Sequence, residues 1–501
     1  MLLSAGPCFI TARQPGAGIY DAASASQGFE ITAPKPSGTL RLGQSFGSSH
    51  TLSLIEADFN RDGITDIASA SHEGTVTILL GDGSGGFRAA GDPISFGTSI
   101  QALASGDFDG DGNPDLAVAT GADQVAVFLG NGAGGFTSAQ GSPFAAGKAP
   151  RSIAIADFNG DGKEDLAIAN FAGGITILQA NGAGGFSEAP GSPFAAGAGT
   201  SAVVAADFNG DGLVDLAAAN SSDGTVTILL GSQSGAFRPA AGSPVTVGML
   251  PQSLVVADFN RDGLEDLATA NRGNGTVTVL LGNGSGGFIA APGSPLAAGL
   301  SLQSVAAGDL DGDGIVDLIA SGNSAGVTVF PGDGTGGFRA PAAFGSPLNS
   351  VFSVVGDFNG DGISDLAAAN FLNGGVTILS GEMSDTIAML HAASSGPVAP
   401  GSSLSLILDL SNGAPAFSSP TGTVTFSDGT RVLGTASENA SPFLFTIPSL
   451  TAGAHTITAR YSGDAHTLAI SASMTITAGN SSAARPQLIA HTTSSSLSSV
   501  T

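Results

Sequence analysis

Seven short acidic segments carry the side chains of this chain that are best suited to chemistry. The pattern D-x-[DN]-x-D-G-x-x-D occurs over residues 58–66, 107–115, 157–165, 207–215, 258–266, 309–317 and 357–365, which we call loops 1 to 7. Positions one, three, five and nine supply side-chain oxygens, and position seven can offer its backbone carbonyl. Hard oxygen ligands of this kind suit Ca²⁺, which takes about six to eight of them. We therefore expect up to seven structural calcium ions.

The candidate metal ligands occupy the same five positions in every loop. They are Asp58, Asn60, Asp62, Ile64 and Asp66; Asp107, Asp109, Asp111, Asn113 and Asp115; Asp157, Asn159, Asp161, Lys163 and Asp165; Asp207, Asn209, Asp211, Leu213 and Asp215; Asp258, Asn260, Asp262, Leu264 and Asp266; Asp309, Asp311, Asp313, Ile315 and Asp317; and Asp357, Asn359, Asp361, Ile363 and Asp365.

The twelfth position separates these loops from EF-hands, whose first half they share. Gly63 and its equivalents allow the sharp turn that both kinds of loop need. An EF-hand requires a bidentate Glu at position twelve. That position instead holds Ser69, Val118, Ile168, Ala218, Thr269, Ala320 and Ala368. We therefore expect the aspartate at position nine to close each site, within a hairpin between two strands.

The charge balance supports cation binding. The chain has 41 Asp and Glu against 15 Lys and Arg; 23 of the acids are Asp at positions one, three, five and nine of the loops, so 41 − 23 = 18 remain in the rest of the chain. A simple polar turn is the alternative for one loop, but seven carboxylate clusters without cations would oppose folding. The net charge of −26 argues against nucleic acid as the main partner.

The elements that must position the loops recur with a period of about 50 residues. Each repeat reads as an apolar run, an acidic loop, a second apolar run, a turn, a third run such as TVTILL, a Gly-rich turn and a strand that opens with GGF. Runs that are apolar at nearly every residue predict sheets covered on both faces. Seven such four-stranded units predict an all-β, seven-bladed β-propeller. A linear solenoid is the alternative, but it would need polar capping repeats.

The two ends of the repeat region predict how the ring closes. A Gly-Phe marker follows the first six repeats, and the seventh repeat ends at Gly381 without one. A matching strand, which includes Gly38 to Arg41, precedes loop 1. We expect this strand to complete the seventh blade, because an unpaired edge would invite aggregation.

The rest of the chain follows another pattern. Segments such as TGTVTFSDG and AHTITARYSGD are short strands at roughly ten-residue spacing, which predicts a small β-sandwich. We expect an N-terminal segment at 1–28 that is an incomplete export region, the propeller at 29–381, a linker at 382–387, the sandwich at 388–478 and a Ser/Thr-rich tail at 479–501. No run of 18 apolar residues predicts a membrane span.

Two enzyme-like motifs are better explained as turns. Gly81, Gly83 and Gly86 form G-x-G-x-x-G, but this motif leads into a strand and not into a helix that could face a phosphate. G-x-S-x-G occurs around Ser45 and Ser324 without the strand-to-helix turn of a nucleophile elbow. The sequence therefore offers no catalytic residue.

The acidic loops, the GGF markers and the period together resemble the FG-GAP/VCBS repeat family, which includes integrin α-subunit propellers. This resemblance implies structural calcium between the first and second strands of each blade, on the face opposite the usual ligand surface. The strands at 388–478 resemble bacterial Ig-like repeats of surface proteins.

The expected function is a calcium-binding, secreted or cell-surface module for adhesion to a protein or glycan ligand. A lyase-like enzyme acting on polysaccharides and a structural spacer are the alternatives. We expect the ligand on the face opposite the loops, where the turns between second and third strands vary most. Phe171, Arg272 and Phe371 are the contact candidates there, together with Lys148 and Arg151 in a connection between blades.

Overall fold

The computed structural model divides into two compact units, one of Gly38–Glu382 and one of Met1–Ser37 with Met383–Thr501. It describes residues 6–14, 23–31, 35–47, 50–299, 301–323, 326–344, 350–360, 362–371, 375–384, 387–393, 398–411, 422–436, 442–462 and 470–478. All its regular elements are β-strands. Within these residues, no helix is long and apolar enough to cross a membrane.

The unit of Gly38–Glu382 consists of seven sheets in its described part, which we call blades 1 to 7. From the innermost strand outward, blade 1 has β4 (Thr51–Ala57), β5 (Asp66–Ser71), β6 (Thr75–Gly81) and β7 (Phe87–Ala89), with β8 (Ile94–Ser95); blade 2 has β9 (Ile100–Gly106), β10 (Asp115–Thr120), β11 (Gln124–Gly130) and β12 (Phe136–Ser138), with β13 (Phe144–Ala145). Blade 3 has β14 (Pro150–Ala156), β15 (Asp165–Asn170), β16 (Gly174–Ala180) and β17 (Phe186–Glu188); blade 4 has β18 (Thr200–Ala206), β19 (Asp215–Asn220), β20 (Thr225–Leu230) and β21 (Arg238–Pro239), with β22 (Val245–Thr246); blade 5 has β23 (Pro251–Ala257), β24 (Asp266–Asn271), β25 (Thr276–Gly282) and β26 (Phe288–Ala290), with β27 (Leu296–Ala297). Blade 6 has β28 (Leu302–Gly308), β29 (Asp317–Gly322), β30 (Gly326–Phe330) and β31 (Ala342–Phe344), and blade 7 has β32 (Ser350–Gly356), β33 (Asp365–Asn370), β34 (Val376–Ser384) and β3 (Lys35–Phe46).

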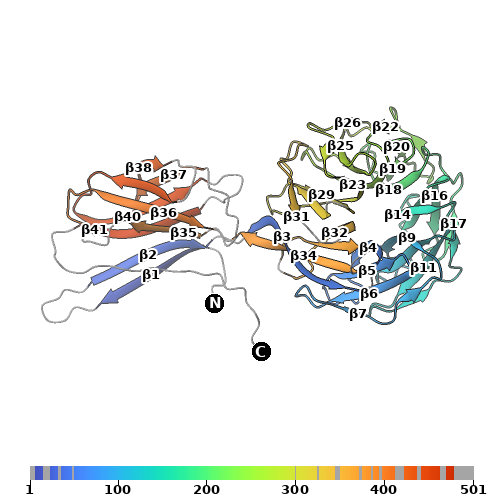
Figure 1. The fold of residues 1–501 in the computed structure, drawn as a ribbon, viewed down its shortest axis with the longest axis horizontal. Helices are drawn as coiled ribbons and strands as arrows, with labels where there is room; N and C mark the ends of the chain where they lie inside the picture. The colour runs from blue at the N-terminus through green and yellow to red at the C-terminus, as the bar shows by residue number, and fades with distance from the viewer. Residues whose placement is uncertain are drawn as a thin grey trace. The chain divides into compact units, whose positions relative to one another are not determined.

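The innermost strands close a ring. Each contacts the innermost strand of the next blade, in the order β4, β9, β14, β18, β23, β28 and β32, and β32 contacts β4 again. Figure 1 shows the blades around this ring. The closed order confirms a propeller and excludes the linear solenoid.

Alternating large and small side chains on the second strands explain how the blades pack. Leu166 and Ile168 of β15 share a core with Ala117 and Ala119 of the preceding blade. Ala167 of β15 faces the other way and packs in a core with the following blade. Both faces of the strand are therefore buried, and the large face of one blade fills the space above the small face of its neighbour.

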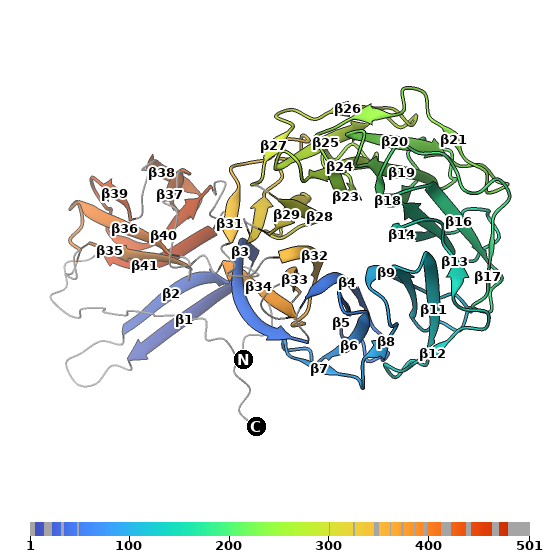
Figure 2. The same cartoon turned by 45° about the vertical axis from the view of Figure 1, so that its right-hand side comes forward.

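The N-terminal strand β3 completes blade 7, as the sequence predicts. It is hydrogen-bonded to β34, so the order in this blade is β3-β34-β33-β32. Figure 2 shows β3, in blue, beside β34, in orange. Leu40 packs against the core that blades 6 and 7 share. The seventh sheet is thus built from both ends of the repeat region.

A substitution at Gly43 is expected to open this closure. A Cβ atom at Gly43 would lie 2.7 Å from the backbone oxygen of Ile378 in β34, so a side chain there cannot fit without separating the strands. We expect Gly43→Val to lower the melting temperature and to promote aggregation through the freed edge of β34. Leu42 is 51% exposed, so Leu42→Ala is the matched control and should melt like the parent. Equal melting curves for both variants in calorimetry would show that β3 does not stabilise the ring.

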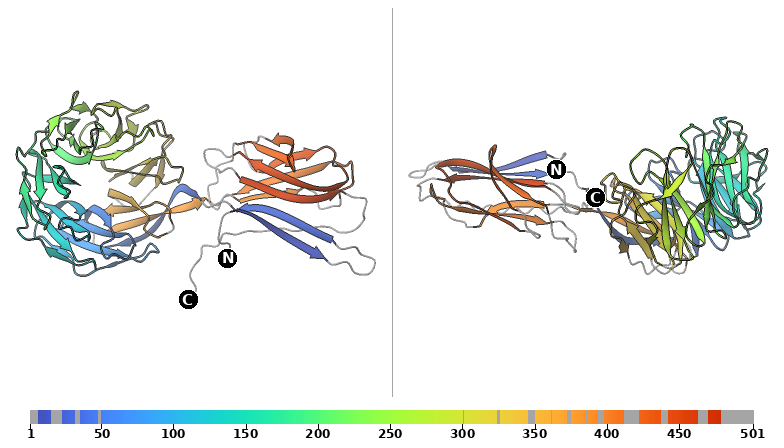
Figure 3. Two further views of the ribbon diagram at one scale, coloured as in Figure 1. Left: turned by 180° about the vertical axis from the view of Figure 1, so that it is seen from behind. Right: turned by 90° about the horizontal axis from the view of Figure 1, so that it is seen from above.

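The other unit is a β-sandwich. Its sheets are β1-β2-β41-β40-β37-β38 and β35-β36-β39, and Figure 3 shows them as layers. The strands are β1 (Gly6–Gln14), β2 (Ala23–Ile31), β35 (Ile387–Ala392), β36 (Leu404–Ser411), β37 (Val424–Asp428), β38 (Arg431–Ala436), β39 (Phe443–Ile447), β40 (Gly453–Tyr461) and β41 (Ile470–Ala478). One core joins the sheets, with Phe426 and Ile457 from the six-stranded sheet and Leu406 from the three-stranded sheet.

The unit boundaries differ from those expected at the N-terminus. Strands β1 and β2 pair antiparallel, and β2 pairs with β41, for example Phe29 with Ala472. Residues 29–31 therefore belong to the sandwich, and the propeller begins at Gly38. The expected linker at 382–387 covers the end of β34 and the first residue of β35. The expected tail at 479–501 lies outside the described residues.

Candidate metal centres

Each acidic loop connects the first and second strands of its blade, and its ninth residue is the first residue of the second strand. The sixth residue is a glycine with a φ near +80°, for example +81° at Gly63 and +78° at Gly314. Only glycine adopts this conformation readily, so the turn that the sequence predicts is present. Asp361, the fifth residue of loop 7, lies outside the described residues.

The first aspartate holds the turn of its own loop. Its Oδ2 accepts the backbone N–H of the sixth residue in all seven loops, at 2.7 to 2.9 Å. In loop 1, Oδ1 of Asp58 also accepts the N–H of Asp62 at 3.1 Å. The carboxylate is thus oriented before any ion binds, which lowers the cost of ordering a site.

The ninth aspartate joins the loop to the middle of its blade. In loop 5, Oδ2 of Asp266 accepts the N–H of Phe259 at 3.0 Å, and Oδ1 accepts the N–H of Gly282 at the end of β25 at 2.8 Å. The same pair of bonds recurs in the other six loops. Because this side chain is buried, its hydrogen bonds stabilise the blade, and it is a candidate ligand as well.

Burial makes these ninth carboxylates difficult to ionise in the absence of a cation. Burial, and then the neighbouring loop carboxylates, raise the pKa of Asp115, Asp165, Asp215 and Asp266 to about 6, against two backbone hydrogen bonds that lower it. The same causes raise the pKa of Asp317 to about 7. A bound cation would favour the ionised form and relieve this penalty.

Loops 2 and 6 gather three carboxylates most closely. In loop 2, Asp107, Asp109 and Asp115 each place one ligand atom within 4.8 Å of the others. Asp309, Asp311 and Asp317 do the same in loop 6. Only these two loops have Asp rather than Asn at position three. The other five loops would supply an amide oxygen at that position.

The fifth and seventh positions are arranged differently from the first, third and ninth. Oδ1 of Asp62 accepts the N–H of Ile64 at 2.8 Å, and the equivalent bond recurs in loops 2 to 6. In loop 3 the Lys163 Nζ lies 3.1 Å from Oδ2 of Asp161. A side-chain cation therefore stands beside one of the candidate ligands there.

The residues present fit a hard divalent cation. The donors are carboxylate and amide oxygens, which suit Ca²⁺. In loop 6, Oδ1 of Asp309 is buried and has no hydrogen-bond partner among the described residues. A buried oxygen without a partner is costly, and a cation coordinated there would remove that cost. The cation would be held by the side chains at positions one, three and nine of the loop.

Phenylalanine at the second position was not singled out from the sequence, although it recurs in six loops. Phe59 is 1% exposed, and its ring meets that of Phe136, from the GGF of the next blade, edge to face at 5.6 Å. The Gly134 N–H in the same turn donates to the carbonyl of Phe59 at 3.0 Å. The Phe87–Phe358 pair repeats this contact between blades 7 and 1. The six loops with this phenylalanine are thus also anchored to the neighbouring blade.

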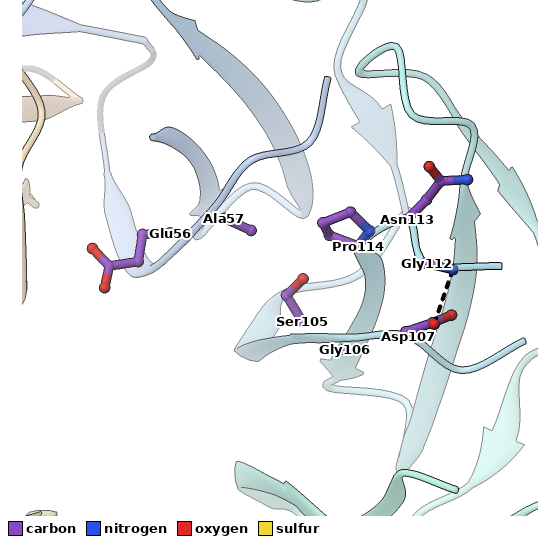
Figure 4. A pocket seen from close by; sticks show the side chains of 8 residues that line it. All are labelled: Glu56, Ala57, Ser105, Gly106, Asp107, Gly112, Asn113 and Pro114. Atoms are coloured by element: carbon purple, nitrogen blue, oxygen red, sulfur yellow. Dashed lines mark hydrogen bonds between the residues drawn. The ribbon is translucent and has the colours of Figure 1, made fainter. Parts of the chain in front are cut away.

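A cavity of about 260 Å³ lies beside loop 2. Figure 4 shows that Glu56 and Ser105, from the ends of two innermost strands, line it together with Asp107 and Asn113 of the loop. Glu56 is exposed, and loss of hydration around its carboxyl raises its pKa to about 7. The cavity therefore lies beside two of the candidate ligands of loop 2, Asp107 and Asn113.

The three contact candidates do not form one group. Phe171 lies under the guanidinium of Arg151, 5.7 Å from its ring centre. Phe371 lies between His50 and His72, at ring distances of 5.4 and 6.1 Å. Arg272 donates its backbone N–H to Leu250 at 3.1 Å. Both histidines belong to blade 1, where the His72 N–H donates to the carbonyl of His50 at 2.9 Å, and Phe371, which is distant in the sequence, meets them where blade 7 packs against blade 1.

Distant similarity to solved structures adds little. BBS1N, solved in complex with ARL6DN, is 14% identical, with 68% of this chain and 97% of that chain covered and a TM-score of 0.48. The extracellular domain of BT4673 from B. thetaiotaomicron is also 14% identical, with 75% and 47% covered and a TM-score of 0.45. At these values the similarity does not bear on function. No curated protein matches the chain significantly.

Family models match most of the chain. The FG-GAP-like repeat matches residues 58–118, 107–168, 157–218, 207–269, 258–320 and 310–368. The bacterial Ig-like domain (group 3) matches residues 390–479. These ranges follow the blades and the sandwich of the structure. The chain therefore belongs to the FG-GAP-like repeat family and carries a bacterial Ig-like domain.

Proposed function

We propose that this protein is a calcium-stabilised, secreted or cell-surface binding module, whose protein or glycan ligand meets the propeller face opposite the acidic loops. Its FG-GAP-like repeats and its Ig-like domain indicate an extracellular or surface module. Millimolar extracellular calcium would fill sites of moderate affinity. The loops then hold the blades in place, and ligand binding is left to the other face.

The observation that carries the proposal is where exposed apolar side chains occur. Phe171 is 41% exposed, Met249 64% and Leu250 44%, and all three lie in turns or connections of that opposite face in blades 3 to 5. Among the described residues of the propeller, the other large exposed apolar side chains are on outermost strands, at Leu42 and Ile289. Exposed apolar groups gathered on one face are typical of binding surfaces.

Two cationic side chains, Arg151 and Lys148, lie near Phe171 and add polar contacts. The Arg151 Nη1 donates to Oε1 of Gln101 at 2.7 Å, which holds the guanidinium over Phe171. Lys148 pairs with Asp123 at 2.9 Å. Aromatic and Arg side chains are the most frequent anchors of protein interfaces.

A ligand found by screening the full chain against glycans and matrix proteins provides the test. We expect Phe171→Ala combined with Met249→Ala to weaken binding by roughly thirtyfold, as loss of about 2 kcal/mol at an interface anchor would do. The variant should keep its melting temperature, because both side chains are exposed. Ile289→Ala, which removes an equally exposed group from an outermost strand, is the control and should bind normally.

The same assay separates the two faces. Substituting Asp157, Asp161 and Asp165 by Ala should reduce stability first, and binding only as far as the fold is lost. If those three substitutions abolish binding at full stability while the Phe171 variant binds normally, the ligand site is in the acidic loops and the proposal is wrong.

A further inference from the structure

Arg339 places a positive charge inside loop 6. Its guanidinium nitrogens lie 3.0 Å from Oδ2 of Asp313 and 3.6 Å from Oδ2 of Asp311. The side chain is 35% exposed, so the pair is partly shielded from water. Arg339 directly follows Phe338 of the GGF marker, and its backbone N–H donates to Pro331 at 2.8 Å. The segment that follows the Gly-rich turn, which is bridged to Gly332 at Phe338, thus brings the arginine onto the loop of its own blade.

The other blades show that this contact needs two features at once. Blade 2 has the same four loop carboxylates but Thr137 at the position equivalent to Arg339. Blades 1 and 4 have Arg88 and Arg238 at that position, but their loops have Asn at position three. Neither of these arginines forms an ion pair within the described part of the chain. Only blade 6 combines an aspartate at position three with the arginine.

We propose that Arg339 is an internal counter-ion of loop 6. Its positive charge holds the loop carboxylates together without a divalent cation, and it weakens the affinity of the loop for such a cation. Loops 2 and 6 then bind calcium unequally although their carboxylates are the same. This inference rests on the proposed calcium binding. The physical reason is that a divalent ion at loop 6 must either displace the guanidinium from Asp311 and Asp313 or remain close to its positive charge.

The size of the effect follows from Coulomb's law. Two unit charges about 4 Å apart interact by about 1 kcal/mol even in water, and a divalent ion doubles that value. The arginine should therefore weaken binding by roughly tenfold or more. Loop 2 has no such charge on its carboxylates, since Arg61 reaches only the Oδ1 of Asn113, at 3.2 Å.

The absence of tryptophan from the chain makes a site-resolved experiment possible. A single Trp introduced at position seven reports terbium bound at that loop through sensitised luminescence, and calcium is then titrated as competitor. Ile315→Trp reports loop 6 and Asn113→Trp reports loop 2. Each Trp variant is measured by itself and in combination with a second substitution. The second substitution is Arg339→Gln in blade 6 and Thr137→Arg in blade 2.

We expect calcium to bind roughly tenfold more tightly at loop 6 after Arg339→Gln, and more weakly at loop 2 after Thr137→Arg. Circular dichroism in calcium checks that all four variants are folded. Luminescence at both loops with an affinity at loop 6 that Arg339→Gln does not change would overturn this inference alone. No terbium luminescence and no calcium binding at either loop would instead contradict the proposed calcium binding.

Discussion

Chelation of calcium is expected to lower the melting temperature of the propeller by about ten degrees or more, given about 2 °C for each kcal/mol lost from a large domain. A site with a dissociation constant near 10⁻⁴ M contributes about 1.4 kcal/mol in about 1 mM calcium. Seven such sites contribute about 10 kcal/mol, as much as the whole stability of an ordinary domain. Without the ions, the carboxylates of each loop repel one another.

Calorimetry of the full chain in 1 mM calcium and in EDTA measures this effect. The Ig-like unit contains none of the seven loops, so its transition is an internal control that should not move. Magnesium at 1 mM should restore little stability, because the smaller ion demands near-ideal octahedral geometry. Identical curves in calcium and EDTA, from protein that contains no calcium by elemental analysis, would contradict the role of the loops as metal sites.

Replacing a ninth aspartate is expected to destabilise the propeller even when no calcium is present. Asn has one acceptor oxygen. In Asp266→Asn, the N–H of either Phe259 or Gly282 therefore faces the NH2 of the amide, which cannot accept a hydrogen bond. An unpaired buried donor costs about 1 to 3 kcal/mol, and loss of the ion adds about 1.4 kcal/mol in calcium. In EDTA, the variant should therefore unfold at a lower denaturant concentration than the parent. In calcium, the difference between the two midpoints should be larger.

Asp262→Asn in the same loop is the matched control. Asp262 is exposed, and its Oδ1 accepts the N–H of Leu264 at 2.9 Å, a bond that the Asn oxygen can keep. Its Oδ2 accepts from the Nδ2 of Asn260 at 2.9 Å, and water can replace this exposed bond. It should match the parent in EDTA and lose stability only in calcium. If the two variants behave alike in EDTA, the ninth carboxylate has no separate structural role.

The repeating parts of this protein can be predicted from sequence. The seven loops, the apolar runs and the glycine turns are local signals, each contained within about 50 residues and repeated often enough to remove ambiguity. The absence of a Gly-Phe marker after the seventh repeat also predicted that a strand near Gly38 would complete the ring, and β3 does so. Local propensity and periodicity are sufficient for such features because each repeat has to bury both faces of the same sheet.

The contacts between segments that are distant in sequence, and the contacts specific to one blade, follow from the three-dimensional packing and not from local pattern. No local pattern predicts that Phe29 pairs with Ala472, since a hairpin at an open edge can pair with any compatible strand. The meeting of His50 with Phe371 exists because the ring closes there. Arg88, Arg238 and Arg339 are equivalent in sequence, but among the described residues only Arg339 pairs with loop carboxylates, because Asp311 adds a negative charge at position three that loops 1 and 4 lack.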